Sequence, residues 1–167
     1  MCRWLAYSGA PILLEEVLFK TDHSLIDQSL HAMDTTNTTN GDGFGIGWYG
    51  KRDVPGVYKD VRPAWNDANL HALSAQIESP MFLAHVRATT GSPVQMTNCH
   101  PFNYRQWLFV HNGLVNEYNR VHRDLAFAVA PELFPLIRGT TDSELMFLLA
   151  LTFGLDTDVF TGVARMA

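Results

Sequence analysis

The cysteine at position 2 could do chemistry that an internal cysteine cannot. A thiol with an ordinary pKa near 8.5 needs a base before it becomes a nucleophile at neutral pH. Removal of Met1 would free the α-amine of Cys2, whose ordinary pKa of about 7.7–8.0 suits it to take the thiol proton. Nucleophile and base would then belong to one residue. Taken alone, Cys2 is more simply interpreted as a buried cysteine at the start of a strand.

Asn112 and Gly113 follow a short apolar segment and could stabilise an oxyanion. An asparagine side-chain amide and a glycine backbone N–H are two donors of the kind that acyl transfer requires. An Asn-Gly hairpin turn is the alternative interpretation of this pair.

Arg87 and Asp142 are candidate binding groups of opposite charge. Arg87 follows the apolar segment 81–86 and could bind a carboxylate through two parallel N–H groups, or form a structural ion pair. Asp142 could hold an ammonium group, cap a helix, or do both. Together with Cys2 and the Asn112-Gly113 pair, these residues would match the α-carboxylate, α-ammonium and side-chain amide of free glutamine.

Short apolar strands alternating with helices would have to position these residues. Between Gly43 and Tyr49 glycine alternates with large apolar residues, so one face of that strand lacks side chains and another backbone or a ligand should approach it. Thr141 or Asp142 should cap the helix 143–153, and Asp156 or Thr157 a last helix. The pattern predicts strands at 2–7, 43–49, 54–59, 81–86 and 107–110, loops at 34–42 and 91–104, and helices at 67–77, within 114–129, at 131–137, at 143–153 and after 156.

The composition excludes several classes of protein. A length of 167 residues fits one domain, and a net charge of −5 lacks the basic footprint of a protein that binds nucleic acid or a membrane. The start of the chain is no secretion signal, so we expect a cytoplasmic protein. Adjacent Cys99 and His100 have poor spacing for a metal site, and Gly41–Gly50 lacks the ending of a phosphate loop, so we expect no metal and no cofactor.

Six segments, in this order along the chain, resemble the class II glutamine amidotransferases, which use an N-terminal nucleophile. The nearest resemblance is to stand-alone, YafJ-type members, which are related to the γ-glutamyl hydrolase of ergothioneine biosynthesis. The segments are 1–7 (Met-Cys-Arg-Trp-Leu-Ala-Tyr), 42–49 (Asp-Gly-Phe-Gly-Ile-Gly-Trp-Tyr), 84–87 (Ala-His-Val-Arg), 98–102 (Asn-Cys-His-Pro-Phe), 109–113 (Phe-Val-His-Asn-Gly) and 141–144 (Thr-Asp-Ser-Glu).

The resemblance implies an α+β fold, the four-layer αββα sandwich of N-terminal nucleophile hydrolases with two antiparallel sheets, formed by one domain over residues 1–167. Family members usually continue further and complete the second sheet, so we expect a C-terminally truncated and incomplete domain. The implied roles are nucleophile for Cys2, oxyanion hole for Asn112 and Gly113, glutamine binding for Arg87 and Asp142, and pocket walls for Thr90 and His100.

The implied reaction is hydrolysis of the side-chain amide of L-glutamine through a γ-glutamyl thioester on Cys2. The ammonia would pass to an unknown acceptor, which could be a separate protein. A γ-glutamyl amide or peptide is the alternative substrate. A catalytically inactive, truncated domain with an accessory binding role is the alternative to an enzyme. An incomplete sheet would leave unpaired edges, which makes a homo-oligomer plausible.

Overall fold

The computed structural model describes residues 2–30, 39–89 and 91–167, which form two compact units. Unit 1 comprises Met1–Asn112 and unit 2 comprises Gly113–Ala167. Met1, Thr90 and most of the predicted loop 34–42 lie outside the described residues, so the expectations placed on them stay predictions.

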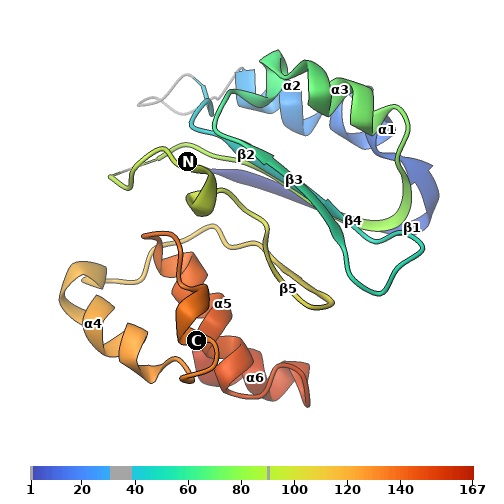
Figure 1. The fold of residues 1–167 in the computed structure, drawn as a ribbon. Helices are drawn as coiled ribbons and strands as arrows, with labels where there is room; N and C mark the ends of the chain where they lie inside the picture. Colours follow the sequence, from blue (N-terminus) through green and yellow to red (C-terminus); the bar gives the residue numbers. More distant parts are fainter. Residues whose placement is uncertain (1, 31–38, 90) are drawn as a thin grey trace. The chain divides into compact units, whose positions relative to one another are not determined.

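A four-stranded antiparallel sheet forms the centre of unit 1, with the strand order β1-β4-β2-β3 (Figure 1). Its register places His85 beside Trp4 on one side and beside Gly45 on the other. The sheet confirms the α+β class with antiparallel pairing. Its strands are β1 (Arg3–Leu13), β2 (Phe44–Trp48), β3 (Gly56–Asp60) and β4 (Glu78–Val86).

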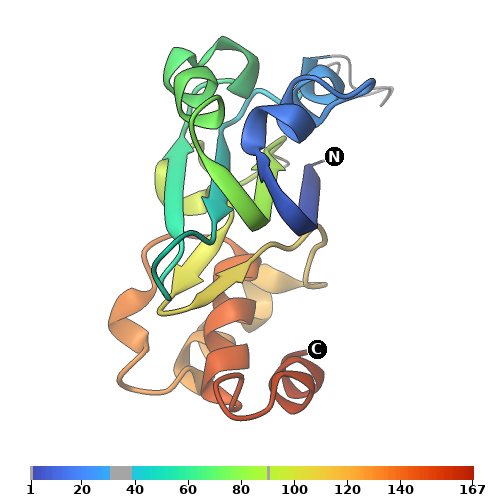
Figure 2. The same cartoon turned by 90° about the vertical axis from the view of Figure 1, so that its right-hand side faces the viewer.

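Three short helices cover one face of this sheet (Figures 1 and 2). They are α1 (Leu14–Leu18), α2 (Leu25–Leu30) and α3 (Ala68–Ser74), and Asp67 caps α3 by accepting from the Leu70 N–H at 2.7 Å. Alternate residues of a strand point to opposite faces, so one set of strand side chains meets the helices. The resulting core contains Leu14, Leu18, Leu25, Ile26, Phe44, Ile46, Leu70, Phe82, Ala84 and Val86.

The opposite face of β2 is the glycine face that the sequence predicts to be approached by another backbone. A Cβ atom at Gly45 would collide with the carbonyl oxygen of His100. At Gly47 it would come within 2.8 Å of the Leu108 side chain and 2.9 Å of Pro101. The prediction of a close backbone approach is therefore confirmed at Gly45, and the chain that approaches this face is a hairpin together with the residues directly before it.

That hairpin consists of β5 (Phe102–Tyr104) and β6 (Trp107–Phe109). The sequence prediction of one loop over 91–104 is wrong for its last three residues, because they find a partner in β6. A pairing partner in space is not visible in a three-residue pattern. The predicted strand at 107–110 is present, although β6 is half-buried rather than buried.

Unit 2 is helical, with α4 (Tyr118–Ala128), α5 (Asp142–Thr152) and α6 (Val159–Met166). Thr141 caps α5 as predicted, accepting from the Glu144 N–H at 3.4 Å. The prediction for the cap of α6 is wrong, since Asp158 accepts from the N–H groups of Phe160 and Thr161.

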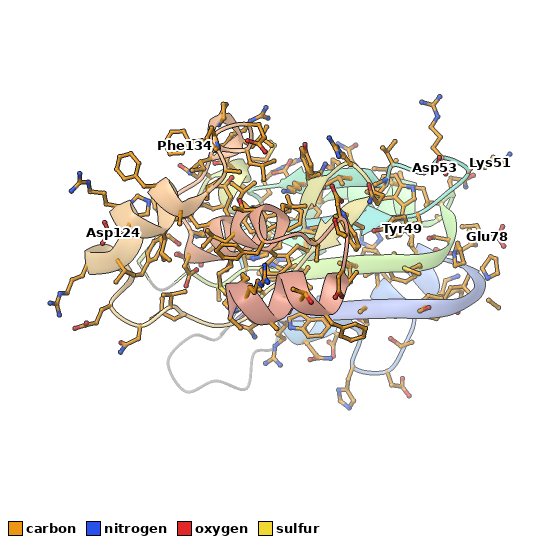
Figure 3. All side chains as sticks on the ribbon, turned by 90° about the horizontal axis from the view of Figure 1, so that it is seen from below. Tyr49, Lys51, Asp53, Glu78, Asp124 and Phe134 are labelled. Carbon is orange, nitrogen blue, oxygen red and sulfur yellow. The ribbon has the colours of Figure 1, made fainter. Side chains whose placement is uncertain are left out.

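The predicted helix at 131–137 is also wrong. The structure has turns there and one 3-10 turn at Phe134–Leu136. Figure 3 labels Phe134 in this turn and Asp124 in α4. Pro135 lacks the N–H that an α-helix needs and restricts the residue before it, so the helical bonding cannot continue.

The helices α4 and α5 have 11 residues each, whereas a membrane span needs about 20 apolar residues. Within residues 2–30, 39–89 and 91–167, no helix is long and apolar enough to cross a membrane.

Candidate active site

Cys2 precedes β1 and is half-buried against the residue that follows Arg87. Its thiol donates to the carbonyl oxygen of Ala88 at 3.3 Å, and the Ala88 N–H donates to the sulfur at 3.4 Å. These contacts hold the candidate nucleophile against the chain just beyond β4. Cys2 and Arg87 are distant in sequence, but the pairing of β1 with β4 brings them together.

Asn112 also lies beside Cys2. Its side-chain Nδ2 donates to the Cys2 carbonyl oxygen at 2.9 Å. An amide nitrogen carries two hydrogens, so one remains for another acceptor. Gly113, the next residue, is the first residue of unit 2. The oxyanion role of these two residues stays a prediction.

Arg87 is 3% exposed and is surrounded by neutral acceptors. Its Nη1 donates to the Asp42 carbonyl oxygen at 3.3 Å. Its Nη2 donates to Ser92 Oγ at 2.6 Å, to the Ser92 carbonyl oxygen at 3.4 Å and to Thr89 Oγ1 at 3.2 Å. Across the part of the chain that the structure describes, no carboxylate forms an ion pair with Arg87, so the structural ion pair considered from the sequence is not found. A buried positive charge without a counter-charge favours the binding of an anion.

Asp42 fastens the segment that carries Arg87. Its carboxylate accepts from the Thr89 N–H at 2.7 Å, and its backbone N–H donates to the Arg87 carbonyl oxygen at 3.0 Å. Sequence reasoning did not select Asp42 as a site residue. Its place at the start of the segment 42–49, which carries the family resemblance, is the signal that could have found it.

The rings of His85 and His100 are both buried and lie against each other at an interplanar angle of 36°, with His85 on the same side of the sheet as Gly45. Their ring centroids lie 4.3 Å apart, and His100 also packs edge-on against Phe102 at 4.6 Å. The ring nitrogens of both histidines are buried without a hydrogen-bond partner among the described residues. Burial, reinforced by the charge of Arg87, lowers the pKa of His85 to about 3. Burial also holds the pKa of His100 well below its ordinary value, so both rings are neutral at pH 7.

The His100 ring packs against the rings of His85 and Phe102. Its role as a wall of the substrate pocket stays a prediction. Within residues 2–30, 39–89 and 91–167, no group of three or more His, Cys, Asp or Glu side chains is arranged to hold a metal ion.

Asp142 begins α5 in unit 2 and is 7% exposed. Its Oδ2 accepts from the Val115 N–H at 2.7 Å, and its Oδ1 accepts from the Ser143 N–H at 2.7 Å and the Ser143 hydroxyl at 3.2 Å. The capping role belongs to Thr141, and no Lys, Arg or His among the described residues pairs with Asp142. A buried carboxylate without a cation favours the binding of an ammonium group.

Tyr118 stands near this carboxylate and was missed by sequence reasoning. Its hydroxyl is buried and has no hydrogen-bond partner among the described residues. Burial, with added repulsion from the negative charges of Asp142 and Glu144, raises the pKa of Tyr118 to about 12. A tyrosine at the start of a helix carries no sequence signal for such a position.

Unit 1 thus carries a thiol whose residue also accepts from a side-chain amide, and the thiol contacts Ala88, the residue after a buried arginine that has no counter-charge among the described residues. Comparison with known proteins shows what kind of protein this is. The sequence model of the family described as "Glutamine amidotransferases class-II" matches residues 16–154. The chain belongs to the class II glutamine amidotransferases.

Two similar proteins come from a yeast and a mycobacterium. The probable glutamine amidotransferase DUG3 of Saccharomyces cerevisiae is 39% identical over 160 residues, which cover 90% of this chain and 45% of that protein. The γ-glutamyl-hercynylcysteine sulfoxide hydrolase of Mycolicibacterium smegmatis is 32% identical over 158 residues, covering 93% of this chain and 65% of that protein.

A solved structure supports the same family. It is that of a glutamine aminotransferase class-II domain protein from Silicibacter pomeroyi, with a TM-score of 0.75 and 37% sequence identity. The match covers 99% of this chain and 61% of that one. The chain therefore spans about half to two thirds of the length of these relatives. The resemblance recognised from the six sequence segments is confirmed.

The family match includes Arg87, Asn112, Gly113 and Asp142 and begins after Cys2. It fixes the family of the chain and leaves the roles of these individual residues to be proposed.

Proposed function

We propose that this protein hydrolyses the side-chain amide of L-glutamine through a γ-glutamyl thioester on Cys2. One observation carries the proposal. Ala88 bonds the Cys2 thiol with both of its backbone groups, and it directly follows Arg87, a buried arginine that has no counter-charge within residues 2–30, 39–89 and 91–167. If Arg87 binds an anion and Cys2 is the nucleophile, the two functions adjoin each other, which suits a substrate with a carboxylate at one end and an amide at the other.

In the first step the α-amine of Cys2, freed by removal of Met1, takes the thiol proton. The thiolate attacks the side-chain carbonyl carbon of glutamine, and the carbonyl oxygen becomes an oxyanion. The side-chain amide of Asn112 and the Gly113 N–H stabilise this oxyanion. Loss of one such donor typically lowers the rate by about 10²–10³-fold. The α-ammonium of Cys2 then protonates the departing nitrogen, which leaves as ammonia.

In the second step water attacks the γ-glutamyl thioester. The bond between sulfur and carbonyl carbon breaks, glutamate leaves, and the thiol regains its proton. During both steps Arg87 binds the α-carboxylate and Asp142 binds the α-ammonium. The absence of a counter-charge at both residues, among those described, supports this assignment. Thr90 and His100 are the proposed pocket walls.

A γ-glutamyl amide or peptide is the second candidate substrate. The mycobacterial relative is named as a hydrolase of a γ-glutamyl compound, and such a substrate presents the same glutamyl end to Cys2, Arg87 and Asp142. The two substrates differ only in the group that leaves.

Three further features belong to the same proposal. The sheet of unit 1 would be one of the two antiparallel sheets of the four-layer sandwich, and residues 1–167 would act as one glutaminase domain. The ammonia would pass to a separate acceptor protein. The strands β1 and β3, which are the outer strands of the sheet among the described residues, could pair in a homo-oligomer.

The test measures glutamate release from L-glutamine and from a panel of γ-glutamyl amides and peptides. The protein is first checked by intact mass for loss of Met1. We expect turnover by the wild type and none by Cys2→Ala, because no other group in the site replaces the thiol. Cys99→Ala is the matched control, since Cys99 is the second of the two cysteines and is fully buried.

Retained activity in Cys2→Ala would overturn the nucleophile assignment. A processed, folded wild type without turnover on any of these compounds would favour an accessory role without catalysis. The ratio of glutamine to γ-glutamyl peptide turnover decides between the two substrate classes.

A further inference from the structure

Arg87 is the only guanidinium in the described chain that the proposed function uses, and its orientation depends on neutral groups. An arginine in an ion pair is oriented by its carboxylate, but Arg87 forms none among the described residues. Something else must keep its N–H groups in a fixed direction, because a flexible arginine loses side-chain entropy each time it binds an anion.

The shortest contact of Arg87 is the one to the side chain of Ser92. The Nη2 group donates to Ser92 Oγ at 2.6 Å, compared with 3.2 Å to Thr89 Oγ1 and 3.3 Å from Nη1 to the Asp42 carbonyl oxygen. Hydrogen bonds from a charged donor are shorter and stronger than neutral ones. The Ser92 hydroxyl is therefore the best-placed acceptor on the guanidinium.

Ser92 is itself held in place by Thr89. The Thr89 hydroxyl donates to the Ser92 carbonyl oxygen at 2.6 Å and accepts from the Ser92 N–H at 3.2 Å. Thr89 is fixed in turn by the carboxylate of Asp42, which accepts from its N–H at 2.7 Å. Asp42, Thr89 and Ser92 thus form a continuous hydrogen-bonded support that ends on Arg87.

We infer that Ser92 is a positioning residue for substrate binding, which orients the Arg87 guanidinium for the α-carboxylate of the glutamyl substrate. The inference rests on the proposed function and extends it to a residue outside the segments that carry the family resemblance. Ser92 acts through Arg87, so its removal should affect only substrates that carry an α-carboxylate.

The test compares the wild type with Ser92→Ala and Ser92→Thr on two substrates, L-glutamine and γ-aminobutyramide, which is glutamine without its α-carboxylate. For Ser92→Ala we expect the KM for glutamine to rise about tenfold with kcat nearly unchanged. The variant loses the hydrogen bond that orients the Arg87 guanidinium, which weakens substrate binding and not the later chemical step. The value of kcat/KM for γ-aminobutyramide should not change. Ser92→Thr retains a hydroxyl and should restore most of the affinity for glutamine.

Two controls separate positioning from folding. Ser74→Ala removes a serine hydroxyl that donates to the His71 carbonyl oxygen at 3.0 Å in α3, and it should leave both substrates unaffected. In an Arg87→Ala background, Ser92→Ala should have no further effect on glutamine, because the group through which it acts is gone.

Three results would overturn the inference while leaving the proposed function standing. They are an unchanged KM for glutamine in Ser92→Ala, an equal loss on both substrates, and a full additional loss in the Arg87→Ala background. A wild type that neither hydrolyses glutamine nor binds L-glutamate in calorimetry would overturn the proposed function, and the role of Ser92 with it.

Discussion

At the scale of single residues, two charged side chains are buried without a counter-charge among the residues that the structure describes. Arg87 in unit 1 and Asp142 in unit 2 are each satisfied by neutral groups only, among the residues described. A structural ion pair would be complete as it stands, whereas these residues can gain by binding a ligand of opposite charge. Under the proposed function, the zwitterionic end of a glutamyl group would supply one charge to each.

Asp142→Asn tests the cation site. Loss of the negative charge should raise the KM for L-glutamine about 10- to 100-fold, because the α-ammonium loses a charged partner. Glutaramate, which is glutamine without its α-amino group, should be hydrolysed as by the wild type. Steady-state glutamate or glutarate release measures both.

Asp158→Asn is the matched control, because Asp158 also accepts from two backbone N–H groups at a helix start in unit 2. It should leave both reactions unchanged. An equal loss on glutamine and glutaramate in Asp142→Asn would assign Asp142 a structural role.

The sequence draws attention to residues that carry charge or nucleophilic character and not to the residues that contact and orient them. Cys2, Arg87 and Asp142 stand out because their chemical types match the parts of one substrate. Ser92 has no such signal, since a serine acquires a role only through the neighbours that the folded loops bring to it.

At the scale of the elements, the glycine face of β2 decides how closely the segment before β5 can pack. The carbonyl oxygen of His100 occupies the space that a side chain at Gly45 would need. That approach places the His100 ring against the ring of His85 in β4, the strand that Arg87 follows.

Gly45→Ala tests this packing. We expect the free energy of unfolding to fall by about 3 kcal/mol, because neither backbone can move without disturbing the pairing of β2 with β4. Gly50→Ala is the control, since a Cβ atom there has no neighbour within 4 Å, and it should change stability by less than about 0.5 kcal/mol. Urea denaturation measures both, and equal midpoints would contradict the close packing.

Period and capping residues were sufficient to predict β2, β4, α3 and α5. The errors at β5, at 131–137 and at the cap of α6 share a cause. In each case the local pattern does not decide the outcome. The strand β5 is three residues long and depends on its pairing with β6, Pro135 limits the turn at 134–136, and several candidate caps precede α6.

At the scale of the whole molecule, the two buried histidines make stability depend on pH. His85 and His100 are neutral in the folded state and titrate near 6.5 when unfolded. As the pH falls below about 6.5, the histidines of the unfolded chain bind protons and those of the folded chain do not. The stability that the two neutral histidines contribute is therefore fully present above this pH and declines towards pH 3.

Each of the two histidines should contribute up to about 1.4 kcal/mol of lost stability per pH unit within this window. Urea denaturation at pH 7.5 and at pH 5.5 measures the difference. His85→Gln should make the dependence shallower, whereas His23→Gln, at a side chain that is 90% exposed, should not. An identical pH dependence in the wild type and His85→Gln would contradict the assignment.

The most direct test of the central proposal is the mass of the intact protein after rapid mixing with L-glutamine and quenching in acid. We predict that the processed protein gains the mass of one γ-glutamyl group, that peptide mapping places it on Cys2, and that Cys2→Ala shows no gain. Turnover of glutamine with no γ-glutamyl group on the protein, or with the group on Cys99, would contradict the proposal.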